Sequence, residues 1–124
     1  MKIKYYENDL PDNLNLGGTV AIDSETMGLN PARDRLCLVQ LSSGNSICHL
    51  VKIIDSRKKP KKLLQLLNNS KVQKIFHFAR FDVAVLKHSY KINIHITVIR
   101  IILIRILAIL LLSGVGGSRA LLRI

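Results

Sequence analysis

The sequence predicts an α/β domain built on a mixed sheet. Turn-forming residues separate three short apolar runs, which predict three strands in a meander: residues 18–23, 36–41 and 47–54. Two segments with helical periodicity follow, with a fourth apolar run at 72–76 between them. Three strands in a meander, followed by helix, strand and helix, are typical of an α/β fold.

Each element has its own local signal. Residues 2–6 can form a short edge strand, and the loop 42–45 joins its two flanking runs into a hairpin. The first helix opens at the basic run 58–62 and ends at 68–70, with four leucines on its buried side: Leu63, Leu64, Leu66 and Leu67. The second helix spans 79–90, where four residues recur at helical spacing: Phe81, Ala84, Val85 and His88.

Length and composition exclude several classes of protein. The 124 residues suit one modest domain, and a hydrophobic content of 48% excludes wholesale disorder. Two cysteines, Cys37 and Cys48, exclude a disulfide-stapled miniprotein and a four-thiolate zinc site, and we expect both to fill the core. The first nine residues lack the apolar segment of a secretory signal, so we expect a cytoplasmic protein.

The charge is strongly basic and unevenly placed. The formal net charge is +11, and all eight acidic residues lie at or before Asp82. A basic excess favours a polyanionic partner, nucleic acid first, although a generally basic surface is the alternative. The sequence predicts no protein partner.

Asp23 and Glu25 are the first candidates for chemistry. They stand two residues apart at the end of a predicted strand, so both carboxylates are expected on one face and Ser24 on the other. Two close carboxylates repel unless a proton or cation lies between them, and Mg²⁺ or Mn²⁺ prefers such oxygen ligands. The alternative is that these polar residues only mark the end of the strand, with Ser24 or Thr26 capping another element.

Asp82 is the third candidate. It follows a predicted strand and lies in the first turn of a predicted helix. The helix dipole alone favours an acid there, which is the structural alternative. In open α/β sheets, however, ligands bind beyond the carboxyl ends of the strands, so Asp82 can converge with Asp23 and Glu25 on one cleft.

Two segments of the chain resemble the motifs of a known enzyme family. Residues 20–29, VAIDSETMGL, resemble the first motif of the DEDD 3′–5′ exonucleases, and residues 74–82, KIFHFARFD, resemble the second. Residues 35–41, RLCLVQL, fit the ribonuclease D branch. The resemblance covers about residues 2–90. It implies a partial ribonuclease H-like fold and stepwise hydrolysis of nucleic acid from the 3′ end, with RNA favoured over DNA.

The resemblance also implies roles for individual residues. Asp23, Glu25 and Asp82 resemble three of the family's four catalytic metal ligands, which hold two Mg²⁺ or Mn²⁺ ions. The segment Met27, Gly28 and Leu29 corresponds to the stretch that packs against the terminal nucleotide, although Met27 and Leu29 can equally be core residues. Three flanking residues complete the substrate-binding candidates: Thr26, His77 and Phe81. For Phe81 a core position is the alternative, and the role of His77 stays open.

The resemblance ends near residue 91. The family has a third motif that carries a Tyr or His and the fourth metal-binding Asp, but no acid follows Asp82 in this chain. We therefore divide the chain into the N-terminal part of an exonuclease domain, 1–91, and a hydrophobic, basic tail, 92–124. The change in composition suggests a truncated or frameshifted copy, so we expect activity to be reduced or lost.

Residues 92–112 allow one further alternative. A helix of this length would cross a bilayer, but Arg100 and Arg105 near its midpoint offset the gain from its aliphatic residues. A buried or aggregation-prone tail is therefore favoured over a membrane span. Two alternative functions remain beside the exonuclease: a catalytically dead nucleic-acid-binding remnant and, less favoured, a small membrane-associated protein.

Overall fold

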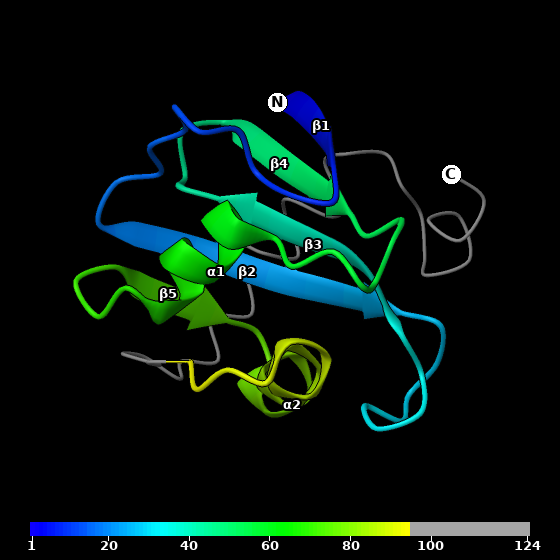
Figure 1. The fold of residues 1–124 in the computed structure, drawn as a ribbon. Coiled ribbons are helices and arrows are strands. Elements are labelled where there is room, and N and C mark those ends of the chain that lie inside the picture. The colour runs from blue at the N-terminus through cyan, green and yellow to red at the C-terminus, as the bar shows by residue number, and fades with distance from the viewer. Residues whose placement is uncertain (95–124) are drawn as a thin grey trace.

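The computed structural model describes residues 1–94 (Figure 1). These residues form a mixed sheet with two helices, as the sequence predicts. The elements in chain order are β1 (Lys2–Glu7), β2 (Thr19–Thr26), β3 (Leu36–Ser42), β4 (Ile47–Lys52), α1 (Lys61–Asn68), β5 (Gln73–Phe76) and α2 (Ala79–Tyr90).

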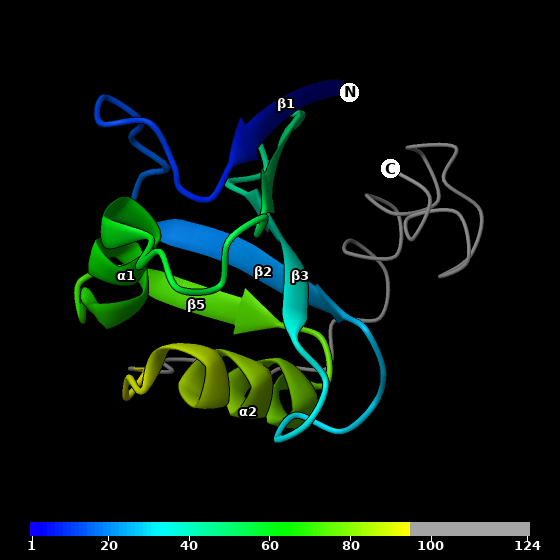
Figure 2. The ribbon, with the colours of Figure 1, turned by 45° about the vertical axis from the view of Figure 1, so that its right-hand side comes forward.

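The sheet has the strand order β1-β4-β3-β2-β5. Strands β2, β3 and β4 pair antiparallel, which confirms the predicted meander and its hairpin. Strand β1 lies at one edge, parallel to β4, and β5 lies at the other, parallel to β2. Because β2 and β5 run in parallel, the carboxyl end of β2 and the start of α2 lie at the same end of the sheet (Figures 1 and 2).

One hydrophobic core joins the two helices to one face of the sheet. Val20 and Ile22 of β2 belong to the same cluster as Leu63 and Leu67 of α1 and Val85 of α2. The buried positions of β2 alternate with half-buried ones, as a strand with one covered face requires. The helices therefore cover the face that carries Val20 and Ile22.

The buried face of α2 differs from the predicted one. Val85 is buried, but Phe81 and Ala84 are half-buried and His88 is exposed. The fully buried positions of the helix are Ala79, Asp82, Val85, Leu86 and Tyr90. Asp82 therefore lies on the buried face of α2, where its carboxylate accepts hydrogen bonds from Ser24 of β2.

The cysteines and the predicted tail complete the comparison. Cys48 is buried and Cys37 half-buried, and both are free thiols. Within residues 1–94, no helix is long and apolar enough to cross a membrane. The possible span at 92–112 lies almost wholly outside the described residues.

Candidate active site

Asp23 and Glu25 share one face of β2, as predicted. They are half-buried, whereas Ile22 and Ser24 are buried on the helix-covered face. The pairing with β3 shifts register between Glu25 and Thr26, so the strand is irregular where the acids end. Such irregularities redirect side chains and are common next to active sites.

Gln40 of β3 supports Asp23. The two residues are paired across the strands and therefore lie on the same face. The Gln40 side-chain amide Nε2 donates a hydrogen bond to Asp23 Oδ2 at 3.2 Å. Gln40 is buried, and a buried amide group without a hydrogen-bond partner is unfavourable. This bond gives the amide a partner and holds one oxygen of Asp23 in place.

The electrostatic environment disfavours charge on both acids. Burial raises the pKa of Asp23, while the Ser24 amide and the nearby His77 lower it in part. Burial also raises the pKa of Glu25, and the charge of Asp23 raises it further. A cation between these carboxylates would relieve their repulsion, so the pair suits a hard divalent ion.

Asp82 reaches β2 from the first turn of α2 and contacts it at Ser24. Its Oδ1 accepts two hydrogen bonds from Ser24, one from the amide at 2.9 Å and one from the hydroxyl at 2.5 Å. Burial raises the pKa of Asp82 to about 7, and the Asp23 charge contributes in the same direction. Asp82 thus lies within electrostatic reach of Asp23, but its hydrogen bonds end on the residue between the two other acids.

The three acids do not form a preformed three-ligand site. Over residues 1–94, no group of three or more His, Cys, Asp or Glu side chains is arranged to hold a metal ion. The donor chemistry of Asp23 and Glu25 fits a divalent cation, since both are oxygen ligands with like charge on one face. Asp82 adds its carboxyl group close by, with Oδ1 already bound to Ser24.

The segment after β2 presents apolar side chains to solvent. Met27 is 59% and Leu29 88% exposed, so the alternative that they fill the core is wrong. The hydroxyl of Thr26 donates to the Gly28 carbonyl and closes the turn. Gly28 lacks a side chain for a local reason, because a Cβ there would lie 2.3 Å from Asp34 Oδ2.

His77 and Phe81 flank the second acidic motif. His77 is half-buried and its ring lies edge-on to that of Phe78, with centroids 4.5 Å apart. His77 also acts electrostatically on Asp23, which places it beside the candidate site. Phe81 is half-buried and packs against the core, in agreement with its structural alternative.

Sequence reasoning missed Gln40 and Phe78 as candidate site residues. Gln40 is the one amide side chain in the apolar run 36–41, and its partner became visible only through the strand register. Phe78 is 66% exposed and has a φ of 52°, in the left-handed region, directly before α2. An exposed aromatic ring is a surface on which the base of a nucleic acid can stack. Nothing in the letters around Phe78 distinguishes it from a core phenylalanine.

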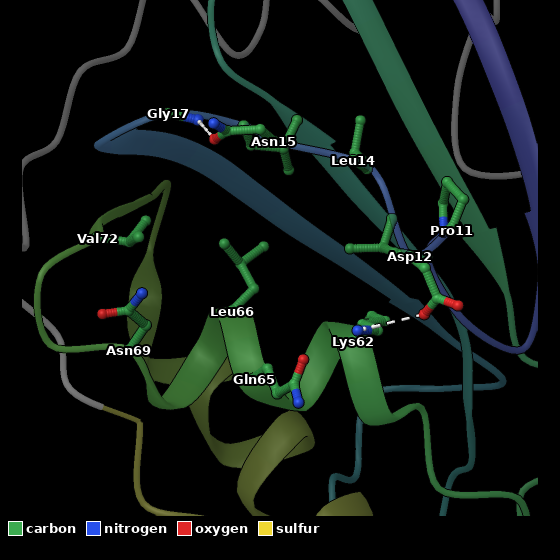
Figure 3. A pocket seen from close by; sticks show the side chains of 12 residues that line it. Pro11, Asp12, Leu14, Asn15, Gly17, Lys62, Gln65, Leu66, Asn69 and Val72 are labelled. Atoms are coloured by element: carbon green, nitrogen blue, oxygen red, sulfur yellow. Dashed lines mark hydrogen bonds and ion pairs between the residues drawn. The ribbon is translucent and has the colours of Figure 1, made fainter.

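A separate cavity of about 260 Å³ lies between α1 and the segment that precedes β2 (Figure 3). Leu14, Leu66 and Val72 form part of its wall, and an ion pair between Lys62 and Asp12 stands at one side. None of the three candidate acids lines it. The cavity therefore belongs to the packing of α1 and not to the candidate active site.

Solved structures similar to this chain include NrnC from Brucella melitensis. NrnC bound to pGG is 46% identical, with a TM-score of 0.72, over 76% of this chain and 47% of NrnC. NrnC with bound Mg²⁺ is 48% identical, with a TM-score of 0.69, over 73% of this chain and 45% of NrnC. The chain thus spans about half the length of these relatives.

A more distant structure shares the fold. RNase D from Escherichia coli, an exoribonuclease involved in structured RNA processing, is 21% identical over 62% of this chain and 20% of its own, with a TM-score of 0.50. The sheet and helices described above are accordingly part of a ribonuclease H-like fold. No curated protein matches the chain.

The family comparison covers most of the sequence. The sequence model of a family described as 3′-5′ exonuclease matches residues 6–111, and so extends beyond the motif resemblance that ends near residue 91. The division of the chain at 91 stays a prediction. Together with the motifs around Asp23 and Asp82, this match shows that the chain belongs to the 3′–5′ exonuclease domain family.

Proposed function

We propose that residues 1–91 are the N-terminal part of a metal-dependent 3′–5′ exonuclease domain that acts on nucleic acid, with RNA favoured over DNA. The observation that carries the proposal is the pair Asp23 and Glu25 on one face at the end of β2, with Asp82 bound to the residue between them. The bound pGG and Mg²⁺ of the NrnC structures support a nucleic-acid substrate and a divalent ion.

We assign each candidate residue a separate role in binding the metal ions or the nucleotide. Asp23, Glu25 and Asp82 would hold the Mg²⁺ or Mn²⁺ ions, with Gln40 orienting Asp23. The ions, when bound, would activate water and stabilise the leaving oxygen. Met27, Gly28 and Leu29 would contact the terminal nucleotide, since Met27 and Leu29 are exposed next to the acids. Thr26 shapes that turn, and His77 and Phe81 would border the nucleotide from the second motif.

Activity in this copy is expected to be weak or absent. Residues 83–124 contain no Asp or Glu, so the fourth carboxylate of the family has no source there. Losing even outer-shell support for a metal commonly costs 10- to 100-fold, and the loss of a direct ligand should cost no less. We therefore expect at best residual turnover that needs a high concentration of the metal ion.

A 5′-labelled oligonucleotide tests the proposal. Purified protein with Mn²⁺ should produce a ladder of products shortened from the 3′ end, faster on RNA than on DNA. The ladder should disappear with Asp23→Ala and remain with Asp12→Ala, which removes an exposed acid that pairs with Lys62 beside the separate cavity. A ladder that survives Asp23→Ala would show that the activity does not arise at this site.

The second candidate function is a catalytically dead nucleic-acid-binding remnant. The absence of acids after Asp82 and the net charge of +11 favour it. Here no ladder would form at any Mn²⁺ concentration, yet fluorescence anisotropy in EDTA would show binding that weakens steeply with salt. The cytoplasmic location and the membrane-associated alternative stay predictions, and carbonate extraction of membranes would exclude the latter by releasing the protein.

A further inference from the structure

Ser24 is the one polar residue among the buried positions of β2. It follows Val20 and Ile22 on the helix-covered face, and its cross-strand partner Val39 is fully buried. A hydroxyl buried among such side chains is costly unless it has a hydrogen-bond partner. The partner is Asp82, which is itself only 4% exposed.

The amide of Ser24 reaches Asp82 because β5 is shorter than β2. The parallel ladder ends at the pair Ile22 and Phe76, whereas β2 continues to Thr26. Beyond Ile22 the edge of β2 therefore has no β5 partner. The chain instead turns into α2 after Phe76, and the Asp82 carboxylate accepts the Ser24 amide there.

Both donors of Ser24 act on one oxygen. The 2.9 Å and 2.5 Å hydrogen bonds end on Asp82 Oδ1, and both residues are shielded from water. Two bonds from one residue restrict rotation of the carboxyl group more than either alone. Since Ser24 stands between Asp23 and Glu25, these bonds tie the third acid to the strand that carries the other two.

We propose that Ser24 is a positioning residue that holds the Asp82 carboxyl group at the end of β2 that carries Asp23 and Glu25 and thereby sets the affinity of the site for a divalent cation. The inference rests on the proposed function, because it takes Asp82 as a metal-binding carboxylate. Its role is distinct from that of the acids, since Ser24 acts through Asp82.

The test compares Ser24→Ala with a matched serine. Ser42 is also a buried strand serine, 7% exposed like Ser24, but its hydroxyl donates to the Ile47 carbonyl. Mn²⁺ affinity, measured by electron paramagnetic resonance of the free ion, should fall about 10-fold or more with Ser24→Ala. The Mn²⁺ affinity of Ser42→Ala should stay within about 2-fold of wild type. Ser24→Thr keeps the hydroxyl, so its Mn²⁺ affinity should be close to that of wild type.

A second measurement keeps the two proposals separate. In metal-free protein, NMR coupling through the hydrogen bond should connect the Ser24 amide nitrogen with the Asp82 carboxyl carbon, and it should weaken in Ser24→Ala only. Equal Mn²⁺ affinity in wild type and Ser24→Ala, or no such coupling in wild type, would overturn the positioning role. Wild type that shows the coupling but binds no Mn²⁺ would refute the proposed metal site, and with it the effect of Ser24 on cation affinity.

Discussion

The carboxylate of Asp9 accepts the backbone amide of Leu63 at 2.9 Å, across 54 residues of sequence. The other oxygen of Asp9 accepts the Lys62 amide at 3.0 Å. Helix α1 begins after Pro60, which supplies no capping side chain. Asp9 therefore caps α1 from the loop after β1, and it satisfies amides that the first turn leaves without intrahelical partners.

Replacing Asp9 should destabilise the fold through this cap. Asp9→Ala leaves the Lys62 and Leu63 amides without these acceptors, so we expect the free energy of unfolding to fall by about 1–2 kcal/mol. Urea denaturation followed by circular dichroism measures the change.

Asp12 is the matched control for Asp9. It makes an ion pair with Lys62 at 3.2 Å, but its side chain is 90% exposed. Exposed ion pairs contribute little, so Asp12→Ala should change stability by less than about 0.5 kcal/mol. Equal losses in the two variants would contradict the capping role of Asp9.

Gly28 should not tolerate a methyl group. Its Cβ would lie 2.3 Å from Asp34 Oδ2, and Asp34 is held by the Asn30 amide and by Arg33. Gly28→Ala should therefore displace Asp34 and lower the free energy of unfolding by about 1–2 kcal/mol, as overpacking does. Gly18→Ala is the control, because a Cβ there meets no atom within 4 Å.

A double-mutant cycle isolates the cause of that loss. If the Gly28→Ala variant is destabilised by its clash with Asp34, the same substitution should cost at least about 0.5 kcal/mol less in an Asp34→Ala background. Urea midpoints of the four proteins give the coupling. Purely additive losses would show that Gly28 is constrained by something other than Asp34.

Asp82 should make stability depend on pH in metal-free buffer. Its pKa is about 7 in the folded protein against an ordinary value of 3.8, so between these values the folded state keeps a proton that the unfolded chain releases. The stability that Asp82 contributes is complete below pH 4 and is lost as the pH rises through 7. The size of this loss is at most about 4 kcal/mol.

The substitution Asp82→Asn tests this linkage. Asparagine cannot ionise but can still accept both hydrogen bonds from Ser24, so the variant should lose stability less steeply between pH 4 and 8 than wild type. Urea denaturation in EDTA at several pH values gives both curves. Asp12→Asn should keep the wild-type slope, and an Asp82→Asn curve parallel to wild type would show that Asp82 does not carry the effect.

Local patterns were enough to predict the elements but not the contacts between distant ones. The apolar runs and helical spacing predicted α2 with its observed limits and the β2–β3–β4 meander, because periodicity and turn residues act within a few positions. The parallel pairing of β1 with β4 joins segments about 45 residues apart and has no local signal.

In the candidate site too, local features were predictable from the sequence and contacts between distant segments were not. The placement of Asp23 and Glu25 on one face follows from strand alternation and was predictable. The bonds from Ser24 to Asp82 depend on where β5 stops relative to β2, which only the register shows. The exposure of Met27 and Leu29 likewise follows from the turn after the irregular end of β2, while their apolar character alone was equally compatible with a core position.

The coupling between Asp23 and Glu25 gives a last prediction. The charge of Asp23 contributes to the raised pKa of Glu25, so Asp23→Asn should lower that pKa toward the usual glutamate value, although burial will keep it somewhat raised. Carboxyl carbon NMR of Glu25 between pH 3 and 8 in EDTA measures the shift. Asp55→Asn, which removes a half-buried acid paired with the exposed Arg57, should leave it unchanged.

Divalent ions extend the same test. A cation shared by the two carboxylates favours their charged forms, so Mg²⁺ should lower the Glu25 pKa in wild type and do so much less in Asp23→Asn. If neither Asp23→Asn nor Mg²⁺ changes the pKa of Glu25, the two carboxylates do not bind a common cation, although their side chains lie on the same face of β2.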